Sequence, residues 1–126
     1  MKYLVLLGRA LFTGIFLIAA PQHFGAGDIA YAAAMGVPFP HLLVPASGLI
    51  AIVGALSILT GYKAKWGAWL IVLFLVPVTF TMHKFWGLSD PQAAMINQIM
   101  FMKNMSMLGG ALLIAYFGSG PLSLKA

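Results

Sequence analysis

LLVPASGLIAIVGALSILT, residues 42–60, contains no charged side chain. A helix of about 20 apolar residues crosses the hydrocarbon core of a bilayer, so this stretch predicts a membrane span. Small residues recur along it at helical spacing: Ser47, Ala51 and Ala55 on one stripe, and Gly54, Ser57 and Gly61 on the next. Small residues at this spacing let helices approach closely in lipid. We interpret the stripes as tight packing within one bundle rather than as a dimer motif.

Three more apolar stretches flank this one, at residues 3–24, 66–86 and 94–117. Hydrophobic residues make up 62% of the 126 residues and charged residues only 7%, far fewer than the ~25% of a soluble domain. We therefore expect one all-α membrane domain, residues 1–126, built as a four-transmembrane-helix bundle. The first stretch resembles a secretory signal, but three spans follow it, so we expect a retained helix.

Residues 25–40 separate the first two spans and are predicted to form a short interfacial helix. Asp28 is a plausible N-cap for a helix over Ile29–Met35, which Gly36 and Pro38 would close. This helix is too short to span a bilayer, so we expect it at the membrane interface or folded against the bundle.

The charges outside the spans predict the orientation of the bundle. Lys2, Lys63, Lys65 and Lys125 fall on one side of a four-span chain, and Asp28 and Asp90 fall on the other with Lys84. The side rich in lysine is expected to be cytoplasmic, which places both termini there. The net charge of +5 is scattered over segment ends and forms no basic stripe, so no nucleic-acid partner is expected.

The composition also excludes several kinds of chemistry. The chain has no cysteine, which rules out thiolate catalysis and thiolate metal sites on this chain alone. No carboxylate lies in any predicted span, so a carboxylate proton relay has no candidates in the membrane. No serine–histidine signature and no phosphate-binding glycine loop is present. Methionines in the last span could bind Cu(I), but methionine also packs apolar helices, and no metal site is predicted.

The few polar residues within the spans are the candidate site. An ionisable group in a span costs at least a few kcal/mol, so it usually faces protein, water or a function. The residues that we expect to converge on one outward-facing polar pocket are Gln22, His23, His83, Lys84, Asn97, Gln98, Lys103 and Asn104. Phe80, Phe85, Trp86 and Phe101 could hold an aromatic ring beside them. Lys103 is the deepest, about 12 Å below the outer end of its span, and we expect it to meet His83.

Each of these residues also has a simpler interpretation. His23 and Lys84 could face water at the boundary, and Asn97 and Gln98 could cap or bridge helices. We expect Arg9, in the first span, to anchor to lipid phosphate or to cap carbonyls.

Several stretches together resemble the DoxX family of small four-helix membrane proteins. They are Arg9 with Gly14, residues 31–38, Gly48-Leu49-Ile50 with Gly54 and Gly61, Pro77-Val78-Thr79 with His83 and Phe85-Trp86, Phe101-Met102-Lys103-Asn104 with Gly109-Gly110, and residues 118–124. One departure is Ala51, where many family members carry a glutamate, so any role of that acid is lost here.

The resemblance implies a membrane component of a redox or detoxification system in a bacterial plasma membrane. Because the chain has no intrinsic electron carrier, a quinone or a partner would have to supply the redox centre. Three hypotheses stay open: a pocket for a quinone or similar apolar molecule, a non-catalytic scaffold that docks a soluble oxidoreductase, and a small transporter or channel subunit, which would need a homo-oligomer. No residue pattern assigns a catalytic reaction to the chain itself.

Overall fold

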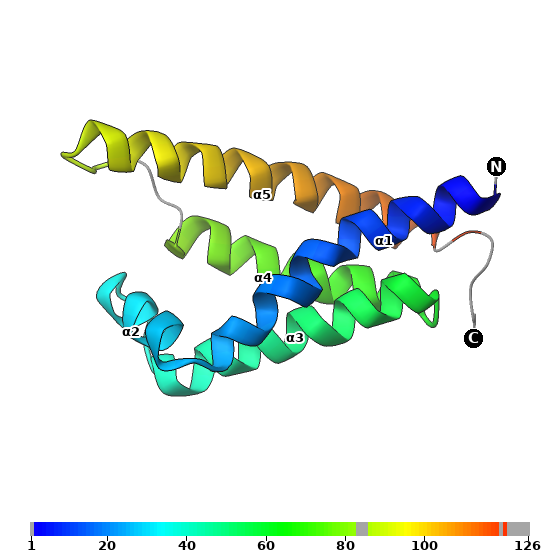
Figure 1. Ribbon diagram of the computed structural model, residues 1–126, viewed down its shortest axis with the longest axis horizontal. Coiled ribbons are helices and arrows are strands. Elements are labelled where there is room, and N and C mark those ends of the chain that lie inside the picture. The colour runs from blue at the N-terminus through cyan, green and yellow to red at the C-terminus, as the bar shows by residue number, and fades with distance from the viewer. Residues whose placement is uncertain (1, 83–85, 119, 121–126) are drawn as a thin grey trace.

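The computed structural model describes residues 2–82, 86–118 and 120, and all regular structure in this part of the chain is helical. The elements are α1 (Lys2–Ala19), the 3-10 helix η1 (Ala20–Phe24), α2 (Ala26–Ala34), α3 (Pro40–Thr60), α4 (Ala64–Met82) and α5 (Pro91–Phe117) (Figure 1). Four segments are long and apolar enough to cross a membrane: Tyr3–Phe24, α3, α4 and α5. The predicted all-α, four-span class is confirmed.

The first span places one stripe of side chains inside the bundle. Arg9, Thr13, Phe16 and Ala20 are spaced by four, three and four residues, and all are buried. That spacing keeps them on one face of a helix. The other faces carry exposed leucines and isoleucines, as expected where a helix meets lipid. Pro21 lies at the start of η1, where the span tightens from α-helix to 3-10 helix.

The short helix between the first two spans exists, but its predicted start is wrong. α2 begins at Ala26 with Gly25 as its N-cap, so Asp28 lies within the first turn instead of capping it. A carboxylate in the first turn still interacts favourably with the helix dipole. Gly36, which has a positive φ of 90°, follows the helix, as the sequence predicted. The interfacial position of α2 stays a prediction.

α3 and α4 form the tightest helix pair. A Cβ placed on Gly54 would lie 2.8 Å from the carbonyl oxygen of Gly67, and one placed on Gly67 would lie 2.5 Å from the hydroxyl of Ser57. The backbones approach so closely that only glycine fits at either position. Ala51 and Ala55, on the same helix, are fully buried. The prediction that the small stripes serve packing within the bundle is confirmed.

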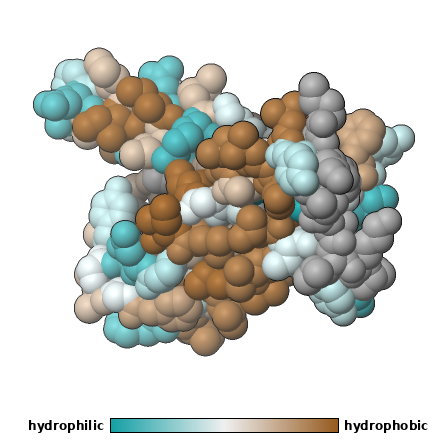
Figure 2. Space-filling model, turned by 45° about the vertical axis from the view of Figure 1, so that its right-hand side comes forward, coloured by the Kyte–Doolittle hydropathy of each residue, from teal (hydrophilic) through white to brown (hydrophobic). Residues whose placement is uncertain are grey.

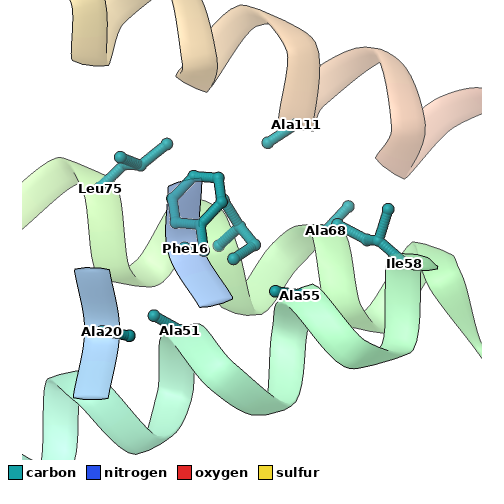
Figure 3. Close-up of a cluster of buried hydrophobic side chains, with 9 residues drawn as sticks. Phe16, Ala20, Ala51, Ala55, Ile58, Ala68, Leu75 and Ala111 are labelled. Atoms are coloured by element: carbon teal, nitrogen blue, oxygen red, sulfur yellow. The ribbon is translucent and has the colours of Figure 1, made fainter. Parts of the chain in front are cut away.

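The helices pack in the order α1, α3, α4, α5, each mainly against the next. Figure 1 shows α1 crossing over α3, while α5 lies along α4 and extends beyond it at the end where α2 lies. Within the described ranges α1 and α5 share no extended interface, although the ring of Phe12 reaches Gly110. Phe16 projects from α1 into the layer between the helices, near Leu75 and Ala111 (Figure 3).

Exposed aromatic side chains mark one end of the bundle. The N-terminus and the α3–α4 turn lie at one end (Figure 1), where the stem of Lys65 packs on Gly118. Tyr3, Trp66 and Tyr116 are exposed at this end, as membrane-interface anchors are. Figure 2 shows a broad apolar surface over the middle of the molecule, with polar residues toward its edges. These features are those of a bundle embedded in a bilayer.

Candidate functional site

A pocket of about 150 Å³ lies between the first span (α1 and η1), α4 and α5. Its described lining residues come from three sides: Ile15, Phe16, Ala19, Ala20 and His23 from the first span, Phe74, Leu75 and Val78 from α4, and Lys103, Asn104 and Met107 from α5. Eight of these eleven side chains are apolar, and the other three are polar. Small-molecule sites typically combine apolar walls with a few polar groups in this way.

His23 is held in place by its neighbours on α3 and α4. Its Nδ1 lies 3.1 Å from the hydroxyl of Ser47, and its ring lies 5.6 Å from the ring of Phe74, centroid to centroid. Gly48 makes the approach possible, because a Cβ on that residue would lie 2.7 Å from the Cβ of His23. The imidazole is therefore fixed by contacts on two sides and still borders the pocket.

Asn104 is the most unusual lining residue. Its side chain is only 5% exposed, and the hydrogen bonds of the described residues include none to its amide, although the polar atoms of that amide are not fully enclosed. The amide therefore keeps accessible surface, and it borders the pocket. Asn104 shares the inward face of α5 with Ala111, seven residues later, so the helix cannot turn the amide outward without exposing its packed face. A ligand in the pocket would satisfy this amide.

Lys103 adds a positive charge at the middle of a span. It is the thirteenth of the 27 residues of α5, which places it about 18 Å along the helix. The helix begins at Pro91, where Asp90 caps it by accepting a hydrogen bond from the backbone N–H of Gln92. Neither carboxylate of the chain belongs to a span or to the described lining of the pocket. Lys103 therefore presents a donor with no carboxylate beside it in the membrane interior.

The pocket collects three of the residues predicted from the sequence: His23, Lys103 and Asn104. Gln22, Asn97, Phe101 and Trp86 are not among its described lining residues, and a binding role for them stays a prediction. His83, Lys84 and Phe85 lie outside the described residues, and so does the expected meeting of His83 with Lys103.

Three of the four predicted aromatic residues, Phe80, Trp86 and Phe101, instead form a separate cluster nearer the α4–α5 link. The ring of Phe101 lies 5.3 Å from that of Phe80 and 5.8 Å from that of Trp86, both edge-on. The rings that border the pocket are Phe16 and Phe74, which the sequence reasoning missed. Phe16 could have been found from its place on the stripe with Arg9 and Thr13, whereas nothing in the sequence marks Phe74.

Burial decides between the two interpretations of Arg9 only in part, because capping of carbonyls stays a prediction. Its side chain is 4% exposed and lies on the buried stripe of α1, so the interpretation that it anchors to lipid phosphate is wrong. It is not among the described lining residues of the pocket. Among the described residues, no group of three histidine or acidic side chains could hold a metal ion.

Comparisons with known proteins place this architecture in a family. Residues 4–84 match the DoxX family. The chain is 30% identical to the inner membrane protein YphA of Escherichia coli over 96% of its length and 87% of that protein. It is 33% identical to the inner membrane protein YqjF of the same organism, over 95% of this chain and 88% of that one. A weaker similarity, 28% identity over 60% of this chain, relates it to 24% of the yeast ER-derived vesicles protein ERV29.

No solved structure matches the chain. The family match covers the first three spans, and the two bacterial relatives cover nearly the whole bundle, both of them proteins of the inner membrane. This multi-pass membrane protein therefore belongs to the DoxX family.

Proposed function

We propose that the pocket between α1 and α5 binds the ring of a quinone or of a similar oxygen-bearing aromatic molecule. The observation that carries the proposal is Asn104, a polar residue only 5% exposed within a membrane span, which lines a mostly apolar pocket. Such a group is stabilised by a ligand oxygen or hydroxyl. The protein would then act as the membrane component of a redox or detoxification system.

The size of the pocket favours a single ring. A volume of about 150 Å³ is comparable to that of an engineered cavity that holds benzene, and it is below the ~300–1,000 Å³ of sites for larger ligands. The walls include two aromatic rings, Phe16 and Phe74, which can pack on a planar ligand. A ring with a long apolar tail would place the ring in the pocket and the tail in the surrounding lipid.

The polar groups suit a ligand with oxygen atoms. The ammonium of Lys103 donates hydrogen bonds, the amide of Asn104 donates and accepts, and His23 offers a ring nitrogen. These residues bind and orient a ring, and a bound quinone or a soluble oxidoreductase partner would supply the electron-carrying chemistry. Because the lysine-rich end also holds the N-terminus, we propose that both termini face the cytoplasm.

Equilibrium binding of a short-tail benzoquinone to the purified protein in detergent micelles tests the proposal. We expect saturable binding that weakens about tenfold in Asn104→Leu, because the amide's hydrogen bonds to the ring are lost. Lys103→Met should weaken it to a similar extent. Matched controls are Lys63→Met, in the exposed α3–α4 turn, and Gln92→Leu, at the exposed start of α5.

Unchanged affinity in both Asn104→Leu and Lys103→Met would contradict the proposed pocket, as would an equal loss in the two controls. Absence of saturable binding in the parent protein would favour the scaffold hypothesis. In that case a soluble oxidoreductase should be captured in stoichiometric amount from native membranes.

A further inference from the structure

His23 is part of a short chain of hydrogen bonds that ends on the backbone of α3. The hydroxyl of Ser47 lies 2.7 Å from the carbonyl oxygen of Val44 and 3.1 Å from Nδ1 of His23. A carbonyl can only accept, and the hydroxyl has a single hydrogen, which takes the shorter contact. The Ser47 oxygen therefore accepts from His23, so Nδ1 carries the proton.

This arrangement assigns the opposite role to the second ring nitrogen. In a neutral imidazole with a proton on Nδ1, Nε2 is an acceptor only. The inference concerns this neutral form of the ring, beside Lys103 and Asn104 in the same lining. Contacts with Gly48 and Phe74 restrain the ring from turning over to exchange its two nitrogens.

The pocket then offers hydrogen-bonding groups of opposite kinds. His23 accepts, Lys103 donates, and Asn104 does either. A ligand that pairs with all three needs a hydroxyl hydrogen for His23 and an oxygen acceptor for Lys103. A fully oxidised quinone has two acceptors and no donor, so it would leave Nε2 unpaired.

We infer that the pocket selects a ring that bears a hydroxyl group, a phenol or the reduced hydroquinone form, over the oxidised quinone. Ser47 is the positioning residue for this preference, because it fixes the proton on Nδ1 of His23. The inference rests on the proposed function, since it names which chemical form the same pocket prefers.

Two redox-inert rings of equal size test the inference: 4-methoxyphenol, which carries a hydroxyl donor, and 4-methylanisole, in which a methyl group replaces it. Binding of each to the protein in micelles gives a ratio of affinities. We expect the parent protein to prefer 4-methoxyphenol by about tenfold, because burying an acceptor without its donor is unfavourable.

In Ser47→Ala the imidazole loses its fixed proton position, so the ratio should fall to about threefold or less. Ser106→Ala is the matched control, because that exposed hydroxyl bonds only the Met102 carbonyl of its own helix, and the ratio should stay unchanged. His23→Phe keeps a ring against Phe74 and removes both nitrogens, so it should bind the two probes about equally. This variant covers the case in which Ser47→Ala disturbs the fold.

The possible results separate the two claims. Binding of neither probe by the parent protein would overturn the proposed function and this inference together. Equal binding of both probes would leave the proposed function standing and overturn the inference. A ratio that persists in both Ser47→Ala and His23→Phe would overturn the role given to His23.

Discussion

Gly48→Ala is the single substitution that best links the packing of the bundle to the pocket. A Cβ at this position would lie 2.7 Å from the Cβ of His23 and 3.0 Å from the carbonyl oxygen of Ala20. Carbon atoms pack best at about 3.5–4.0 Å, so η1 must move about 1 Å away from α3. The contact between His23 and Ser47, now 3.1 Å, would lengthen to about 4 Å, beyond hydrogen-bonding distance.

The expected effect on stability follows from comparison with Gly109→Ala. Both glycines lie inside long helices, where alanine is intrinsically better by about 1 kcal/mol. A Cβ at Gly109 meets nothing within 4 Å, whereas one at Gly48 overpacks a contact with backbone, which costs about 1–3 kcal/mol. Since the intrinsic gain cancels between the two variants, Gly48→Ala should be less stable than Gly109→Ala by about 1–3 kcal/mol.

Thermal unfolding in micelles measures the stability difference, and ring binding measures the pocket. Gly48→Ala should unfold at a lower temperature than Gly109→Ala and should bind 4-methoxyphenol more weakly, because the ring of His23 has moved. Equal unfolding temperatures together with parental affinity in Gly48→Ala would refute the reasoning from close packing to pocket geometry.

Three further predictions concern the frame around the pocket. Gly67→Ala should lower the unfolding temperature more than Gly109→Ala does, because its Cβ would lie 2.8 Å from the backbone of α3. Asp90→Ala should destabilise the start of α5 by about 1 kcal/mol, because the N-cap is lost. Amide hydrogen exchange should become faster in the first turn of α5 and stay unchanged in its last turn. The chain has no cysteine, so single cysteines can report the orientation. Lys63→Cys should react with a membrane-impermeant thiol reagent only from the cytoplasmic side, and Ser89→Cys only from the other side. The reverse pattern would contradict the proposed orientation.

The spans were predictable because their determinants are local. A stretch such as residues 42–60 has no charge and a regular series of small residues, and both features act within one helix. The start of α2 was missed because Gly25 and Asp28 compete as caps three residues apart, and the choice depends on how η1 ends. The end of η1 depends on packing against α3, which sequence spacing does not encode.

The pocket was predictable only in part. Lys103 and Asn104 stood out because polar groups are rare inside spans. The sequence could not rank His23 against His83, since both are predicted near the outer ends of their spans; His23 borders the pocket, and His83 lies outside the described residues. The hydrogen bond from His23 to Ser47 joins residues 24 positions apart, and Ser47 looks like one more small residue on a packing stripe. Such pairing depends on how α1 crosses α3, a tertiary property.

The side-chain amide signals of Asn104 and Asn97, the two asparagines of the chain, offer the most direct measurement. Nuclear magnetic resonance of the protein in micelles would follow both signals as 4-methoxyphenol is added, with Asn104→Leu assigning them. If the amide of Asn104 binds a ring oxygen, its signal should shift and saturate as the ring is added. Saturable binding that leaves the Asn104 signal unmoved would show that the ring binds elsewhere.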